Sequence, residues 1–150
     1  MLALLGPAVV WAADEGAYFS ELPVVASVSR LPQRLADAPT AVTVIDRDMI
    51  RASGSRTLND LFRLVPGFQT HPHTTEPARV SYHGLNDEDY SPRVQVLIDG
   101  RSMYSPLFGN GVNWATLPVA LDDIERIEVV RGTNGVSYGS NAFLGVINII

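Results

Sequence analysis

The sequence predicts an α+β fold, in which two or three short helices and long loops accompany a small mixed β-sheet. Helix-type patterns cluster between residues 46 and 65, and strand-type runs of β-branched residues dominate the segments that follow. The length agrees, because 150 residues suffice for one domain with a hydrophobic core. Hydrophobic residues make up 46% and charged residues 18% of the chain, which is typical of a folded protein.

The N-terminus has the character of a secretory signal. Residues 1–13 carry no charge and are mostly apolar, but a helix that spans a bilayer needs about 20 such residues. Small residues flank Trp11, so we expect a signal peptide over residues 1–12, with cleavage after Ala12. The basic start of a signal is missing, which indicates that this signal is incomplete. A buried N-terminal helix is the alternative.

An extended arm is predicted next, over residues 13–40, because this stretch mixes Pro, Ala and Ser with scattered charges. Within the arm, residues 22–28 are rich in valine and have the composition of a strand. Pro23 lacks an N–H group, which favours an edge strand or an unpaired strand.

The main domain is expected over residues 41–150. It begins with a β-branched strand at 41–45, and a helix follows that Asp46 caps and Gly54 ends. A second helix is predicted over 57–65, because its apolar residues recur with the i, i+3, i+4, i+7 spacing of one helix face: Leu58, Leu61, Phe62 and Val65.

The rest of the domain is predicted to consist of strands and loops. The Pro66-Gly67 pair ends the second helix, and a short helical turn fits residues 118–122. The remaining strands are expected at 67–70, 78–83, 93–98, 126–130 and 145–150.

The loops offer a candidate ligand-binding end. If strands 78–83 and 93–98 are antiparallel neighbours, the loops 71–77 and 99–114 lie at one end of the sheet, opposite the loop 84–92. Aromatic rings provide flat apolar contact and amides provide hydrogen bonds to a small molecule. Packing of these side chains within the protein is the alternative. The candidate ligand-facing residues are His71, His73, Tyr104, Phe108, Asn110, Asn113 and Trp114.

The composition excludes several classes of function. The chain has no cysteine, so disulfides, thiolate metal sites and a cysteine nucleophile are excluded. A net charge of −5 argues against a nucleic-acid partner. All eleven basic residues are arginine, which excludes the lysine of a phosphate-binding Walker loop. No nucleophile elbow or other catalytic grouping is found, so we expect neither an enzyme nor a cofactor.

Two further motifs receive a structural interpretation. His71 and His73 flank a proline, but no third ligand is evident, so no metal site is predicted. The Asp99-Gly100 pair is predicted to form a turn. Tight turns with positive φ are likewise expected at Gly132, Gly135, Gly139 and Gly145.

Five ordered segments carry a family resemblance: residues 57–68 (TLNDLFRLVPGF), 96–104 (VLIDGRSMY), 124–132 (IERIEVVRG), 138–142 (YGSNA) and 145–150 (GVINII). Together they resemble the plug domains of TonB-dependent outer-membrane receptors, and the resemblance covers residues 21–150. Two positions depart from the family pattern. His83 stands where the family often has arginine, and Thr133 stands where it often has proline.

The resemblance implies a plug that fills a 22-stranded outer-membrane β-barrel. At about 10 residues per spanning strand, such a barrel needs at least ~220 residues, so we expect it to lie outside this chain. The implied location is the outer membrane of a Gram-negative bacterium, and the implied function is gated uptake of a metal chelate such as a siderophore or cobalamin. A stand-alone periplasmic ligand-binding module with the plug fold is the alternative, and an unknown hydrolase is a more distant one.

The resemblance also places a TonB box in the arm. In this interpretation the segment adds as a strand to the periplasmic C-terminal domain of TonB, and main-chain hydrogen bonds provide the affinity. A plain linker is the alternative. The residues of the predicted box are Glu21, Leu22, Pro23, Val24, Val25, Ala26 and Ser27.

Charges alternate in sign along the predicted strand near residue 128. The family resemblance implies that these side chains form ion pairs and hydrogen bonds with the barrel wall. A solvated strand face is the alternative for the chain on its own. The residues concerned are Glu125, Arg126, Glu128 and Arg131.

Overall fold

The computed structural model describes residues 24–27, 31–71, 79–85, 93–108, 111–133 and 135–150. Among these residues, no helix has the length and apolar character needed to cross a lipid bilayer. The predicted signal and the first three residues of the predicted TonB box, Glu21, Leu22 and Pro23, lie outside the described part.

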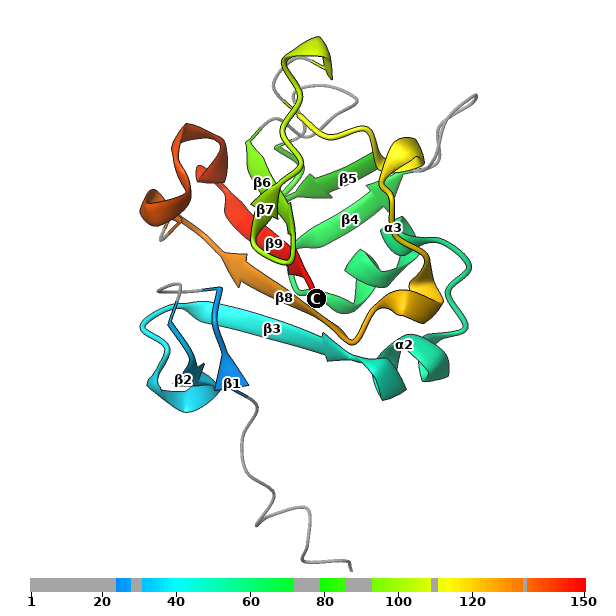
Figure 1. Ribbon diagram of the computed structural model, residues 1–150, viewed down its shortest axis with the longest axis horizontal. Coiled ribbons are helices and arrows are strands. Elements are labelled where there is room, and N and C mark those ends of the chain that lie inside the picture. Colours follow the sequence, from blue (N-terminus) through cyan, green and yellow to red (C-terminus); the bar gives the residue numbers. More distant parts are fainter. Residues whose placement is uncertain (1–23, 28–30, 72–78, 86–92, 109–110, 134) are drawn as a thin grey trace, which may run out of the picture.

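The predicted α+β class is confirmed (Figure 1). Short helical elements alternate with strands throughout the described part of the chain. The strands are β1 (Val24–Val25), β2 (Gln33–Arg34), β3 (Ala41–Asp46), β4 (Phe68–His71), β5 (Arg79–Tyr82), β6 (Val94–Ile98), β7 (Arg101–Ser102), β8 (Arg126–Arg131) and β9 (Gly145–Ile149). The α-helices are α2 (Arg47–Ser53) and α3 (Leu58–Leu61). The 3-10 helices are η1 (Leu35–Asp37), η2 (Phe62–Leu64), η3 (Pro106–Phe108), η4 (Trp114–Thr116), η5 (Leu121–Asp123), η6 (Val136–Tyr138) and η7 (Ser140–Ala142).

The centre of the molecule is a five-stranded mixed sheet with the order β3-β8-β9-β6-β7. All neighbouring strands are antiparallel except β6 and β9, which run parallel. Two small antiparallel pairs, β1–β2 and β4–β5, accompany the sheet (Figure 1). The three inner strands β8, β9 and β6 are almost entirely buried, because elements pack on both faces of the sheet.

The two faces of the sheet bury different clusters. The larger cluster contains Leu61 and Phe62 together with Ile127 and Ile147 of the sheet, so α3 and η2 cover this face. The smaller cluster joins Val25 to sheet residues of the opposite face, so the N-terminal elements cover that one. Successive residues of a strand point to opposite faces, and this alternation divides β8 between the two clusters.

The predicted junction between the first strand and the first helix is confirmed. The Oδ1 atom of Asp46 accepts a hydrogen bond of 2.8 Å from the N–H group of Met49, which satisfies one of the free donors at the start of α2. Gly54 ends the helix with a φ of 63°, in the left-handed region that glycine adopts without strain.

This cap yields a first prediction. Asp46→Ala should lower the free energy of unfolding by about 1 kcal/mol, because the Met49 N–H group loses its acceptor. Asp46→Asn is the matched control, since asparagine caps about as well as aspartate and differs only in charge. Urea unfolding followed by circular dichroism measures both variants, and equal losses would show that charge, and not capping, is the cause.

The predicted second helix is confirmed as a helical segment, although only its first part is α-helical. Leu61, Phe62 and Val65 are buried in the larger cluster, and Leu58 is partly buried against it. The segment tightens to a 3-10 turn from Phe62 onward, before the predicted stop at Pro66 and Gly67. The predicted apolar face is therefore the face that covers the sheet.

The predicted pairing of strands 78–83 and 93–98 is wrong. β5 pairs with β4, while β6 lies between β9 and β7 in the main sheet. β5 pairs with β4, the strand that precedes it in the sequence, whereas β6 is apolar except for Gln95 and takes an inner position that is buried on both faces. The argument that placed the loops 71–77 and 99–114 together at one end therefore fails.

The turn and glycine predictions are confirmed in part. Asp99 and Gly100 form the two-residue turn between β6 and β7, with φ values of 49° and 75°. Gly132 and Gly139 have the expected positive φ. The expectation is wrong for Gly135 and Gly145, which do not have a positive φ. At these two positions there is no room for a side chain, because an added Cβ atom would lie 2.6 Å from a neighbouring atom.

Candidate functional site

The described part of the predicted TonB box is docked against the sheet. Val24 and Val25 form β1, which pairs with β2 in the register Val24 to Arg34 and Val25 to Gln33. Val25 is fully buried in the smaller cluster, whereas the side chain of Val24 is 51% exposed. Successive side chains of a strand point to opposite sides, so only Val25 of these two valines anchors the segment in the core.

A buried carboxylate holds the next two residues. The Oε2 atom of Glu128 accepts hydrogen bonds from the N–H groups of Ala26 at 3.0 Å and Ser27 at 2.9 Å. The hydroxyl of Ser27 donates to the same oxygen at 2.6 Å. Glu128 is 0% exposed and Ser27 only 1%, so these bonds lie out of solvent. Three donors thus converge on one atom of the central strand β8.

The second oxygen of the same carboxylate faces an arginine. The Nε atom of Arg126 donates to Oε1 of Glu128 at 3.0 Å, and its Nη1 atom pairs with Glu125 at 2.7 Å. Removing a carboxylate from water costs several kcal/mol, so a buried one is retained only where donors and an opposite charge surround it. Here Arg126 supplies the charge, and the N-terminal segment supplies most of the donors.

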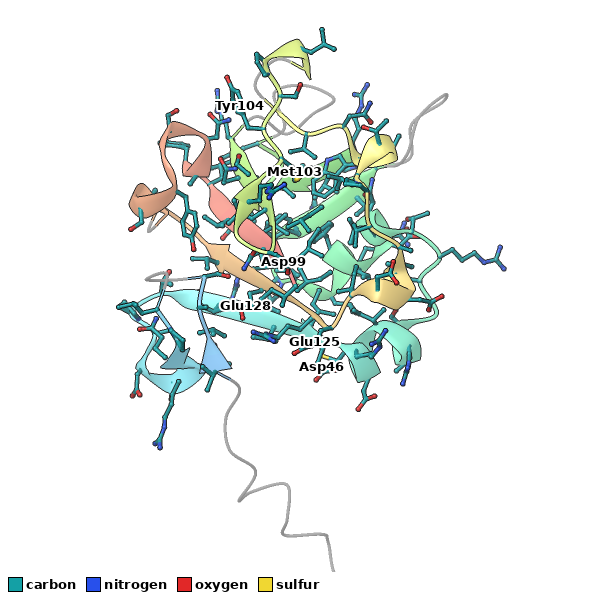
Figure 2. All side chains as sticks on the ribbon, in the orientation of Figure 1. Asp46, Asp99, Met103, Tyr104, Glu125 and Glu128 are labelled. Atoms are coloured by element: carbon teal, nitrogen blue, oxygen red, sulfur yellow. The ribbon has the colours of Figure 1, made fainter. Side chains whose placement is uncertain are left out.

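Further polar groups continue across this face of the sheet. Glu128 stands opposite Asn148 of β9 in the antiparallel register. The Oδ1 atom of Asn148 accepts a hydrogen bond of 3.1 Å from the N–H group of Gly100, in the turn after β6. A cavity of about 410 Å³ lies here, lined by Ala26, Asp99, Gly100, Tyr138, Asn148 and Ile150. Figure 2 labels Glu128 on β8 and Asp99 in the turn after β6.

The four charged residues predicted to contact a barrel wall differ in how accessible they are. Glu125 lies largely in solvent, and Arg126 is partly exposed. For Glu128 the prediction needs correction, because its carboxylate is enclosed within the domain and binds residues 26 and 27 of the same chain. Arg131 is half-buried at the end of β8, and its Nε atom has no hydrogen-bond partner among the described residues.

The predicted ligand-facing residues lie on several elements. His71 ends β4, and its Nε2 atom is 3.2 Å from the hydroxyl of Ser81 on β5. Tyr104 is 42% exposed, on the segment that leaves β7 (Figure 2). Asn113 caps η4, since its Oδ1 atom accepts from the N–H group of Ala115. Phe108 ends η3, and His73 and Asn110 lie outside the described residues.

Trp114 belongs to the core. It is 8% exposed, and its ring meets Phe62 edge to face at a centroid distance of 5.3 Å. The prediction of an exposed aromatic surface is therefore wrong for this residue, because the apolar face of α3 and η2 needs a covering group. Its Nε1 atom has no hydrogen-bond partner among the residues described, and the side chain lines a cavity of about 620 Å³ beside α2 and α3.

The contact between Glu128 and Ser27 was not predicted from the sequence. One signal for it is present in the residues themselves. Glu128 is the one charged residue in the run 127–130, whose other members Ile127, Val129 and Val130 are apolar. A carboxylate in a buried strand needs donors, but the sequence does not say that they come from a segment 101 residues away.

Comparison with known proteins identifies the fold and the family. Residues 34–146 match the family described as TonB-dependent Receptor Plug Domain. The fold also resembles a chain in the structure of the FpvAI–pyocin S2 complex, with a TM-score of 0.63 and 21% identity over 87% of this chain and 17% of that one. For the siderophore receptor PirA from Pseudomonas aeruginosa, the TM-score is 0.51 with 30% identity over 76% of this chain and 18% of that one.

Curated relatives agree. The vitamin B12 transporter BtuB of Vibrio vulnificus (strain CMCP6) is 34% identical over 129 residues, which cover 85% of this chain and 20% of the relative. The iron-regulated outer membrane virulence protein of Vibrio cholerae is 33% identical over 132 residues, which cover 85% of this chain and 19% of the relative. The chain thus spans about a fifth of the length of these relatives. It belongs to the TonB-dependent receptor plug domain family.

Proposed function

We propose that this domain is the plug of a TonB-dependent transporter in the outer membrane of a Gram-negative bacterium, where it gates the uptake of a metal chelate such as a siderophore or cobalamin. The match of residues 34–146 to the plug family is the observation that carries this proposal. The names of the relatives support the substrate class, since they include a vitamin B12 transporter and a siderophore receptor.

The proposed periplasmic partner is the C-terminal domain of TonB, which binds the segment that contains Val24–Ser27. Within the described residues β1 has one strand partner, β2, on one side. A strand with an unpaired edge can accept a further strand. Main-chain bonds along this edge supply affinity without demanding a particular side chain. The partial exposure of the segment, with Val24 outward, supports this assignment.

A titration tests the partner. When the isotopically labelled 150-residue chain is titrated with the TonB C-terminal domain, the amide resonances of residues 24–27 should shift or broaden. Val24→Pro should weaken the binding at least tenfold, because proline removes a main-chain donor and restricts the strand. Leu107→Ala, at the 83% exposed Leu107 of η3, is the control and should bind normally. Unmoved resonances at residues 24–27 would contradict the proposed partner.

Contacts with a surrounding barrel are proposed for the charged residues that stay accessible. Glu125 and Arg126 retain exposed surface, and Arg131 keeps a donor without a hydrogen-bond partner in the described structure. A carboxylate or carbonyl group of the barrel can pair with the part of the half-buried Arg131 guanidinium that stays accessible, and the loss of such a pair weakens the contact between plug and barrel. Arg131→Gln in the complete receptor should therefore increase permeability through the barrel, which antibiotic sensitivity of whole cells measures.

The ligand-facing surface is proposed to include Tyr104 and Phe108, and also the polar residues His71, His73, Asn110 and Asn113. Tyr104 supports this assignment because its large ring is substantially exposed on the segment after β7. The alternative function is a stand-alone periplasmic module that binds the same ligands. Calorimetry of this chain with cyanocobalamin and with a ferric siderophore distinguishes the two. Saturable binding without a barrel favours the module, and its absence favours the plug.

A further inference from the structure

The carboxylate of Glu128 has no role in forming the sheet. Backbone pairing holds β8 between β3 and β9. On this face Glu128 has the apolar neighbours Val44 and Val130 and the polar neighbours Arg126 and Asn148. A hydrophobic residue at position 128 would fit this environment at lower desolvation cost. Instead, the side chain places a charged acceptor under the N-terminal segment, where three donors meet one oxygen atom.

We propose that Glu128 is the positioning residue that keeps Val24–Ser27 docked on the sheet, and that Arg126 orients its carboxylate. This inference rests on the proposed function only in giving the segment a TonB partner. The docking itself follows from the three bonds to Oε2 and from the bond of Arg126 to Oε1. Glu128 thereby controls how often the segment leaves the sheet and becomes available to a binding partner.

The geometry makes release cooperative. The two N–H groups of Ala26 and Ser27 and the Ser27 hydroxyl share one acceptor atom, so the segment cannot leave without uncovering the charge of Glu128. β1 has only two residues, and Val25 alone buries its side chain in the smaller cluster. Apart from the pairing of β1 with β2, the charge-assisted bonds are therefore the directional contacts that tie the segment to the main sheet.

Glu128→Gln tests the role of the negative charge without changing the packing, because glutamine has nearly the same shape as glutamate. An amide has one acceptor oxygen and one donor nitrogen. If the nitrogen faces Ala26 and Ser27, it meets three donors; if it faces Arg126, it meets the Nε donor. Neither orientation satisfies both sides, so the segment should be released more often while the apolar core keeps its volume.

Cysteine labelling measures this release directly, because the chain contains no cysteine of its own. Val25→Cys places a thiol on the docked segment, and Val129→Cys places a matched thiol on the opposite face of β8. Both positions are 0% exposed. The rate of maleimide modification under native conditions then reports how often each site opens.

We expect Glu128→Gln to accelerate modification at position 25 by about 10-fold to 100-fold, the range that corresponds to losing one hydrogen bond to a charged group. The rate at position 129 should stay within about twofold. Ser27→Ala, which removes only the hydroxyl donor, should give a smaller acceleration at position 25. Asp123→Asn, at an exposed carboxylate of η5, is the control and should change neither rate.

Two results would overturn the inference. One is an unchanged rate at position 25, and the other is an equal acceleration at both positions, which indicates general destabilisation. Should Glu128→Gln fail to fold, Ser27→Ala carries the same test with the carboxylate intact. The outcome is independent of TonB, because no partner is present during labelling. The two experiments can therefore give different answers. If TonB does not bind but Glu128→Gln still accelerates labelling at position 25 selectively, the proposed TonB partner is contradicted and the docking role of Glu128 is supported.

Discussion

Gly145→Ala is expected to lower the free energy of unfolding by about 3 kcal/mol, at the upper end of the cost of overpacking a well-packed interior. Gly145 begins β9 and pairs with Arg131 of β8 and with Val94 of β6, so backbone surrounds it on both sides. A Cβ atom at this position would lie 2.6 Å from the carbonyl oxygen of Val130. That oxygen belongs to the backbone of a central strand, so it cannot move aside without disturbing the sheet.

Gly54→Ala is the matched control for this substitution. Gly54 has a φ of 63°, but an added Cβ there would meet nothing within 4 Å. Its cost should be about 1 kcal/mol, from the left-handed backbone alone. Urea unfolding of both variants followed by circular dichroism measures the difference. A loss at Gly145 no larger than that at Gly54 would contradict the crowding argument.

Phe62→Ala is expected to have the largest effect, a loss of about 3–5 kcal/mol. Phe62 is 0% exposed and lies at the centre of the larger cluster. Its ring meets Trp114 at a centroid distance of 5.3 Å and Phe68 at 6.0 Å. Truncation removes this burial and leaves a cavity that three separate chain segments would have to fill together.

Leu64→Ala provides the comparison for Phe62, because Leu64 ends the same 3-10 helix but is 41% exposed. It should change the free energy of unfolding by no more than about 0.5 kcal/mol. Intrinsic fluorescence during denaturation is a convenient measure, since Trp114 lies beside the removed ring. Similar losses in the two variants would show that this turn does not anchor the core as described.

Several features were predictable because their causes are local. Asp46 and Gly54 bound a helix through contacts within a few residues, and the Asp99-Gly100 turn follows from backbone conformations that those two residues tolerate. The spacing of Leu61, Phe62 and Val65 gave the buried face of the second helical segment. The ordered motifs resembled the plug family, to which residues 34–146 belong.

The sequence by itself therefore determined the short helices, most strand positions, the turns and the family. Only the tertiary structure decided which strands are neighbours. β6 and β9, for example, pair across about fifty residues, and no local sequence pattern predicts that pairing. It likewise moved Trp114 into the core and turned Glu128 inward to residues 26 and 27. A buried charge or ring takes its role from the groups that enclose it, and folding brings those groups from distant parts of the chain.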